Sequence, residues 1–144
     1  MPDVVHLKGQ CLCGAVTISA RATDPFLRAC HCEMCRRHTS GVFVNITTEQ
    51  DSIVVEGPAT VFESSAWANR GFCAVCGSTL WYGTTQDGVR NLAAGLFDNA
   101  GGASLAREYF VDQCPDGYGL TGHHEKLTRQ QTIALFAPDE GDAT

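Results

Sequence analysis

The sequence predicts a mainly β protein made of short antiparallel strands. Apolar residues alternate with polar ones over runs of a few residues, and Gly and Pro recur between these runs. Only two short segments are candidates for helices. The chain has 144 residues, of which 44% are hydrophobic, so it can form one domain with a real core.

Seven runs are predicted to be strands, and turn residues separate them; Gly57-Pro58, for example, predicts a turn. In sequence order the predicted strands are 16–20, 41–47, 52–57, 59–64, 78–83, 89–95 and 107–112. Residues 33–39 have room for one or two helical turns. Residues 124–136 are the best candidate for a longer helix.

A single zinc-binding domain is expected over residues 1–136. Its first residues, 1–5, are expected to be a loose start, and residues 137–144 an acidic flexible tail. Most apolar residues are expected in the core, including Trp67, Trp81 and Phe110.

Charge and hydropathy argue against several classes of partner. The formal net charge is −6, whereas a general nucleic-acid binder or a protein docked on an anionic membrane normally carries excess positive charge. No apolar stretch approaches the roughly 20 residues that a membrane-spanning helix needs. The N-terminus, MPDVVHLKGQ, lacks the apolar segment of a secretory signal. A cytoplasmic protein that binds neither nucleic acid nor membrane is expected.

The chain has eight cysteines, seven of which lie in three tight groups. In a reducing compartment such clusters hold metal more often than they form disulfides. The groups are a C-x-C pair at Cys11 and Cys13, a C-H-C-x-x-C triplet at Cys30, Cys32 and Cys35, and a C-x-x-C pair at Cys73 and Cys76.

The number of sulfurs indicates two metal sites. Zinc takes four ligands in a closed structural site and three protein ligands in an open catalytic one. The triplet supplies three ligands by itself, so the simplest assignment joins the two pairs, Cys11 and Cys13 with Cys73 and Cys76. Gly14 and Gly77 follow these pairs and would let backbone N–H groups turn toward the sulfurs. The alternatives are free thiols, a redox dithiol, whose usual βαβ context is absent here, and an iron–sulfur cluster, for which two sets of four cysteines are not available.

Three stretches, GQCLCGAV, CHCEMCRRHTSG and GFCAVCGSTLWY, resemble the glutathione-dependent formaldehyde-activating enzyme (Gfa) family, also called centromere-protein-V-like. The resemblance runs from about Gly9 to Tyr118. It implies an Mss4-like β-tent of packed antiparallel sheets and two zinc ions per chain. The implied structural ligands are Cys11, Cys13, Cys73 and Cys76. The implied ligands of the second, open site are Cys30, Cys32 and Cys35, which with three ligands would hold zinc less firmly.

The family's named activity is of the carbon–sulfur lyase type. Written in reverse, it joins glutathione and formaldehyde into S-hydroxymethylglutathione, which implies a small thiol such as glutathione as the partner of this chain. The chain departs from the family late. Glu108 stands where a His is common, Cys114 where a Lys is common, and Gly117 where a Trp is common, so the thiol substrate can differ.

Candidate catalytic residues lie around the triplet. Arg36 and Arg37 follow it directly and could bind a glutathione carboxylate or offset the charge of the thiolates, although surface arginines are common. His31 lies between two ligands and is a candidate proton carrier or packing residue; His38 is a weaker one. His123 and His124 lie in a polar loop and are expected to be solvated.

Cys114 is expected to be a free thiol in an exposed turn. As a fourth ligand it would make the second site structural. That outcome would favour the alternative to an enzyme, a non-catalytic zinc-stabilised module that binds a protein partner. A redox or metal-buffering role is a third possibility. The oligomeric state cannot be predicted from the sequence.

Overall fold

The computed structural model describes residues 2–136, which form two compact units. The first unit comprises residues 2–27 and 45–104, and the second comprises residues 28–44 and 105–136. The predicted acidic tail, residues 137–144, lies outside the described residues. The assignment of residues 1–136 to one domain stays a prediction.

The fold is mainly β, as predicted. The first unit contains a small antiparallel sheet of β1 (Val4–Gln10), β2 (Thr17–Thr23) and β5 (Val54–Glu56), in the order β1-β2-β5. Strands β1 and β2 pair along their whole length, from Val4 opposite Thr23 to Gln10 opposite Thr17. The expectation of a loose start over residues 1–5 is therefore wrong for residues 4 and 5, because β2 supplies their backbone partners.

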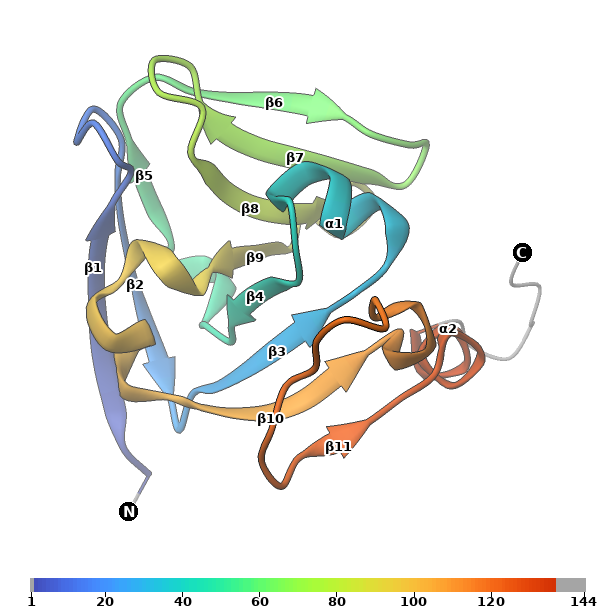
Figure 1. Ribbon diagram of the computed structural model, residues 1–144. Coiled ribbons are helices and arrows are strands. Elements are labelled where there is room, and N and C mark those ends of the chain that lie inside the picture. The colour runs from blue at the N-terminus through green and yellow to red at the C-terminus, as the bar shows by residue number, and fades with distance from the viewer. Residues whose placement is uncertain (1, 137–144) are drawn as a thin grey trace. The chain divides into compact units, whose positions relative to one another are not determined.

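The other strands of the first unit form an antiparallel meander. They are β6 (Ala59–Glu63), β7 (Ala68–Cys73), β8 (Thr79–Thr84) and β9 (Arg90–Ala93). Their order is β9-β8-β7-β6, and the end of β4 pairs with β9 through Asn45 and Ile46 (Figure 1). Short 3-10 helices follow or connect the strands: η1 (Gln50–Ser52), η2 (Ala94–Leu96) and η3 (Asp98–Gly102).

Apolar side chains of both sheets form the core of the first unit. The largest aliphatic side chains with almost no exposed surface are Val16, Ile18, Ile46, Leu80 and Leu92. Trp81 is buried, as predicted, but Trp67 is 53% exposed because it lies in the connection between β6 and β7. Phe110, the third aromatic residue predicted in the core, is only half-buried.

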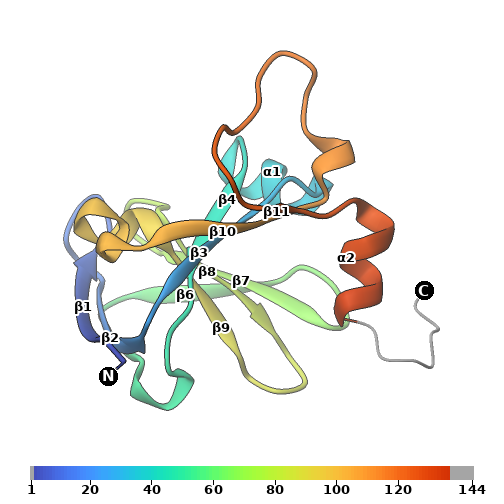
Figure 2. The same cartoon turned by 90° about the horizontal axis from the view of Figure 1, so that it is seen from below.

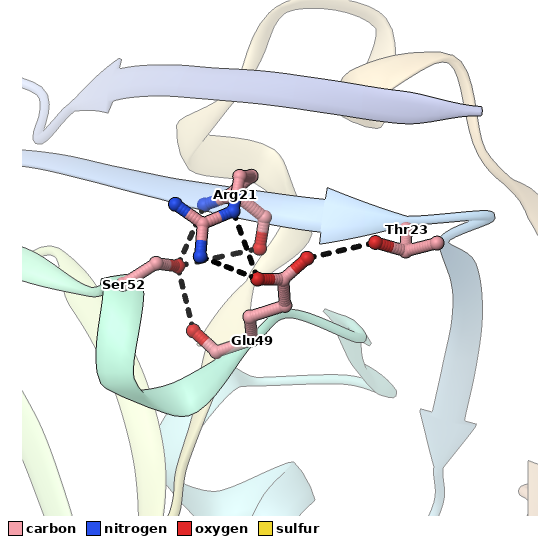
Figure 3. A network of polar contacts seen from close by, with 4 residues as sticks. All are labelled: Arg21, Thr23, Glu49 and Ser52. Atoms are coloured by element: carbon pink, nitrogen blue, oxygen red, sulfur yellow. Dashed lines mark hydrogen bonds and ion pairs between the residues drawn. The ribbon is translucent and has the colours of Figure 1, made fainter. Parts of the chain in front are cut away.

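A polar network fastens η1 to β2 in the first unit (Figure 3). The Arg21 Nε donates to Glu49 Oε1 at 2.8 Å, and the Thr23 hydroxyl donates to the other Glu49 oxygen at 2.7 Å. The Arg21 backbone N–H donates to the Ser52 hydroxyl at 2.8 Å. The hydrogen bond from Arg21 lowers the pKa of Glu49. Because these side chains are partly exposed, the network contributes more to the position of the turn than to stability.

The second unit contains strands in the order β11-β10-β3-β4 and two helices. Its elements are β3 (Phe26–Cys30), α1 (Glu33–Thr39), β4 (Phe43–Ile46), β10 (Ser104–Tyr109), η4 (Val111–Gln113), β11 (Glu125–Lys126) and α2 (Arg129–Phe136). Helix α1 has the predicted bounds. The helix predicted over residues 124–136 is shorter, because Glu125 and Lys126 pair with β10 as a parallel strand. The long loop between η4 and β11 projects away from β10 and β11 in Figure 2.

No helix within residues 2–136 has both the length and the apolar character needed to cross a membrane.

Gly71 on β7 tests how tightly the meander is packed. A Cβ atom at this position would lie 2.3 Å from the ring of Trp81, the residue opposite on β8. We expect Gly71→Ala to lower the free energy of unfolding by about 1–3 kcal/mol, because the ring has to move out of its site. Urea denaturation followed by tryptophan fluorescence measures the change. The matched control is Gly95→Ala, where an added Cβ has no neighbour within 4 Å; equal stabilities of the two variants would contradict the prediction.

Candidate metal centres

Four cysteines of the first unit come together from two distant loops. Cys11 and Cys13 lie in the connection from β1 to β2, Cys73 ends β7, and Cys76 lies in the turn before β8. Their sulfur atoms all lie within 4.8 Å of one another. The Cys11 and Cys13 sulfurs are 3.7 Å apart, and the Cys13 and Cys73 sulfurs 3.9 Å apart.

These distances fit a single metal ion. Four sulfurs placed tetrahedrally about 2.3 Å from one zinc ion stand about 3.8 Å apart. A disulfide needs about 2.05 Å, and none of the eight cysteines is in a disulfide. The donor set, four sulfurs with one of them exposed, therefore fits a closed site for a soft divalent ion.

Backbone N–H groups point at these sulfurs. Val16 donates to the Cys11 sulfur at 3.3 Å, and Val75 and Cys76 donate to the Cys73 sulfur at 3.3 and 3.4 Å. The turns that aim these donors need a left-handed residue, and Gly14 and Gly77 supply it with φ of 82° and 80°. The two glycines have the left-handed conformation that the expected turns require, and their own N–H groups donate to the carbonyls of Cys11 and Cys73.

The second group lies in the second unit. Cys30 ends β3, Cys32 caps the N-terminus of α1, and Cys35 lies on the first turn of that helix. The three sulfurs lie within 4.8 Å of one another, and the Cys32 sulfur also accepts the Cys35 N–H at 3.3 Å. Among residues 2–136 no further Cys, His, Asp or Glu joins this group. The set therefore offers three ligands for a metal ion.

The sulfurs of each group strongly affect one another's ionisation. Hydrogen bonds from Cys30 and Cys35 lower the pKa of Cys32 to about 2, whereas hydrogen bonds with Cys32 and Cys35 raise the pKa of Cys30. In the other group the Ser78 hydroxyl lowers the pKa of Cys76 to about 5. The Ala15 N–H favours the Cys13 thiolate, but desolvation and the neighbouring thiols outweigh it and raise the pKa of Cys13 to about 11. Each group thus holds at least one thiol whose ionisation is favoured and one whose ionisation is opposed, and a bound cation would favour ionisation of all the sulfurs.

His31, between Cys30 and Cys32, belongs to a buried polar chain. Its Nε2 lies 2.6 Å from Glu108 Oε2, and the Nε2 of His124 lies 2.7 Å from Glu108 Oε1. The side chains of His31, Glu108 and His124 are 1%, 5% and 1% exposed. The expectation that His124 is solvated is therefore wrong, because its ring turns inward to the Glu108 carboxylate.

The arginines after the triplet differ in their contacts. Arg37 forms an exposed ion pair with Glu33 one helical turn away, at 2.6 Å. Arg36 is exposed, and within the described part of the chain it has no ion-pair or hydrogen-bonding partner for its side chain. Cys114 does not join the triplet: its thiol donates to the Tyr118 carbonyl at 3.3 Å.

Sequence reasoning grouped the seven cysteines as the structure does but missed the polar chain. Glu108 was noticed only as a departure from the family pattern. An acidic residue beside Tyr109 and Phe110, near the start of a predicted strand, was the only local signal that it is buried. His124 is 16 residues from Glu108 and gave no signal at all.

The fold and the two groups define a mainly β protein with one four-cysteine and one three-cysteine metal-binding group. A profile of the family described as glutathione-dependent formaldehyde-activating enzyme matches residues 6–113. The chain belongs to this family. It is also 32% identical over 130 residues to an uncharacterized lyase of Schizosaccharomyces pombe, a match that covers 88% of this chain and 93% of the relative. Together these similarities support a Gfa-type lyase.

Cys73 belongs to the four-cysteine group, and its replacement should lower the stability of the whole first unit. We expect Cys73→Ser to lose one equivalent of metal and to lower the melting temperature by about 10 °C or more, because metal binding at such sites is coupled to folding. Elemental analysis and a thermal melt measure the two effects. Cys114→Ser, outside both groups, should change neither; an unaltered melting curve for Cys73→Ser would rule out a structural metal here.

Proposed function

We propose that this chain is a zinc-dependent carbon–sulfur lyase that forms or breaks the bond between a small thiol and an aldehyde carbon, as between glutathione and formaldehyde. The three-cysteine group of Cys30, Cys32 and Cys35 carries the proposal. It has the number of protein ligands typical of a catalytic zinc, whereas the four-cysteine group has the number typical of a structural zinc. Family membership and the lyase relative support the same reaction class.

Zinc held by the three thiolates would supply a Lewis acid that lowers the pKa of a thiol bound in the open position. In the direction of addition, the sulfur bonds to the aldehyde carbon and the thiol proton moves to the carbonyl oxygen. The reverse direction breaks the carbon–sulfur bond and returns the proton, so neither an oxidant nor a reductant is required.

The chain itself would orient the sulfurs and balance their charge. Cys30 and Cys32 flank His31 in extended backbone, and Cys35 is buried on α1. Three thiolates and a thiolate substrate around one divalent ion leave a net charge of −2, so a nearby cation stabilises the bound state. Arg36 is the better candidate, because the Arg37 guanidinium is paired with Glu33. Arg36 would bind a carboxylate of the thiol substrate.

A reducing compartment such as the cytoplasm suits this function. None of the eight cysteines is in a disulfide, and two tight groups of sulfurs can hold metal only while they stay reduced.

Metal analysis is the first test. We expect two zinc ions per chain, and X-ray absorption should detect an additional sulfur ligand when glutathione is added, because the open position accepts the thiol. Two zinc ions whose coordination does not respond to glutathione or to other small thiols would support the alternative, a non-catalytic zinc-stabilised module that binds a protein partner. A single zinc ion would overturn the proposal of an open catalytic site.

A substitution of Cys32 tests the proposed catalytic site separately from folding. We expect Cys32→Ser to keep the fold, to lose one of the two zinc ions, and to reduce formation of S-hydroxymethylglutathione to the uncatalysed rate. Exchange NMR of glutathione with formaldehyde measures the rate, with the spontaneous addition subtracted and Cys114→Ser as the control. If Cys32→Ser unfolds as readily as Cys73→Ser, the division into a structural and a catalytic site is wrong.

A further inference from the structure

The buried chain of His31, Glu108 and His124 joins the three-cysteine group to a distant loop. Glu108 lies on β10 and His124 directly precedes β11, which pairs with β10. The carboxylate of Glu108 makes one short contact to each imidazole, at 2.6 and 2.7 Å. All three side chains are at least nine-tenths buried.

The hydrogen-bond roles in this chain follow from the chemistry of its central group. Burial alone would raise the pKa of Glu108, but the hydrogen bonds from His124 and His31 outweigh it and the pKa is lowered. An ionised carboxylate only accepts hydrogen bonds. Each histidine therefore has to carry a hydrogen on Nε2, the atom that faces Glu108. Removing either donor leaves a buried carboxylate oxygen without its partner, which is costly.

His31 is held at two points, and both lie on β10. Its ring donates to the Glu108 side chain, and its backbone N–H donates to the carbonyl of the next residue, Tyr109, at 3.1 Å. Residue 31 is therefore fixed in both backbone position and ring orientation. The two sulfur-bearing residues are its direct neighbours, Cys30 and Cys32.

Because His31 lies between Cys30 and Cys32 in the chain, fixing His31 also restricts the positions of the two sulfur atoms. Cys30 ends β3, and Cys32 has extended φ and ψ of −60° and 158°. The Cys30 and Cys32 sulfurs lie within 4.8 Å of each other, whereas the ring of His31 between them contacts Glu108 and does not join the sulfur group. A clamp on His31 therefore holds the two sulfurs from behind without competing for the metal.

We propose that Glu108 and His124 are positioning residues for the three-cysteine group. They clamp His31 and so keep the Cys30 and Cys32 sulfurs at the spacing that binds a metal ion. The inference rests on the proposed function in one respect, that this group holds zinc. It adds that the loop ending at His124, which lies where the chain departs from its family, helps to determine how firmly the metal is held.

Zinc affinity is the decisive measurement, made by chelator competition on the full chain. Outer partners of metal ligands typically contribute about 10- to 100-fold in affinity. We expect His124→Ala to weaken the binding of the more weakly held zinc by about tenfold or more and to leave the more tightly held zinc unchanged. The more tightly held zinc, at the four-cysteine group, serves as an internal control for folding.

Two variants make the result specific to the hydrogen bond. In His124→Gln the amide nitrogen replaces Nε2 and can still donate to Glu108, so zinc affinity should stay within about threefold of the native value. His123→Ala removes the adjacent exposed imidazole and should have no effect. Equal zinc affinity of His124→Ala and the native chain would overturn the proposal. Equal weakening in the alanine and glutamine variants would also overturn it, because the loss would then not follow the donor.

The histidine tautomers give a second readout that does not depend on zinc. Long-range proton–nitrogen NMR should show His31 and His124 both with hydrogen on Nε2. In Glu108→Gln the amide offers one acceptor and one donor atom, so one of the two rings should switch tautomer. A native His31 with hydrogen on Nδ1 alone would overturn the clamp. If the native chain binds only one zinc but shows the predicted tautomers, the proposed function fails while the hydrogen-bonded chain stands.

Discussion

The mutual opposition of crowded thiolates is the constraint on which both metal-binding groups depend. Each group places sulfurs within 4.8 Å of one another, and each contains a thiol that is harder to ionise. The neighbouring sulfurs raise the pKa of Cys30, and desolvation together with the neighbouring thiols raises the pKa of Cys13. Backbone N–H groups offset part of this cost, as at Cys11 and Cys73. A divalent cation would offset the rest, so sulfurs gathered this closely are suited to hold a metal ion.

The two cysteine groups are held in place by structural elements of different stability. The four-cysteine group joins loops about sixty residues apart, each bounded by paired strands over a packed core. Its ligands would be held by the sheets even before metal binds. The three-cysteine group depends on one strand end and on α1, a helix of seven residues that is too short to be stable alone. Its geometry therefore depends on contacts from β10, which explains why a buried clamp behind Cys30 and Cys32 has a function to perform.

Features that depend on residues close together in the sequence could be predicted, and features that depend on contacts between distant residues could not. The cysteine groups were predictable because pairs spaced by one or two residues are local, and the count of donors limits how they combine. Strands with alternating residues, such as β2, were also predictable. Strand β1 was missed because VVHLKGQ lacks clear alternation, and β7 because Asn69, Arg70 and Gly71 interrupt its apolar pattern. Trp67 was misassigned since apolarity alone does not distinguish a core position from a turn. The contact of His124 with Glu108 was out of reach because only tertiary pairing of β10 with β11 brings the two residues together.

At Glu108 the chain departs from the family pattern, and the structure shows that this residue forms a different set of hydrogen bonds there. An acidic residue in place of the usual histidine brings a charge into a buried position, which is tolerated only with two donors. His31 supplies one donor from within the three-cysteine motif, and His124 supplies the other from the loop before β11. The same loop carries Cys114 and Gly117, the other departures. The chain thus keeps the sulfur chemistry of its family while changing the segment that supports it from behind.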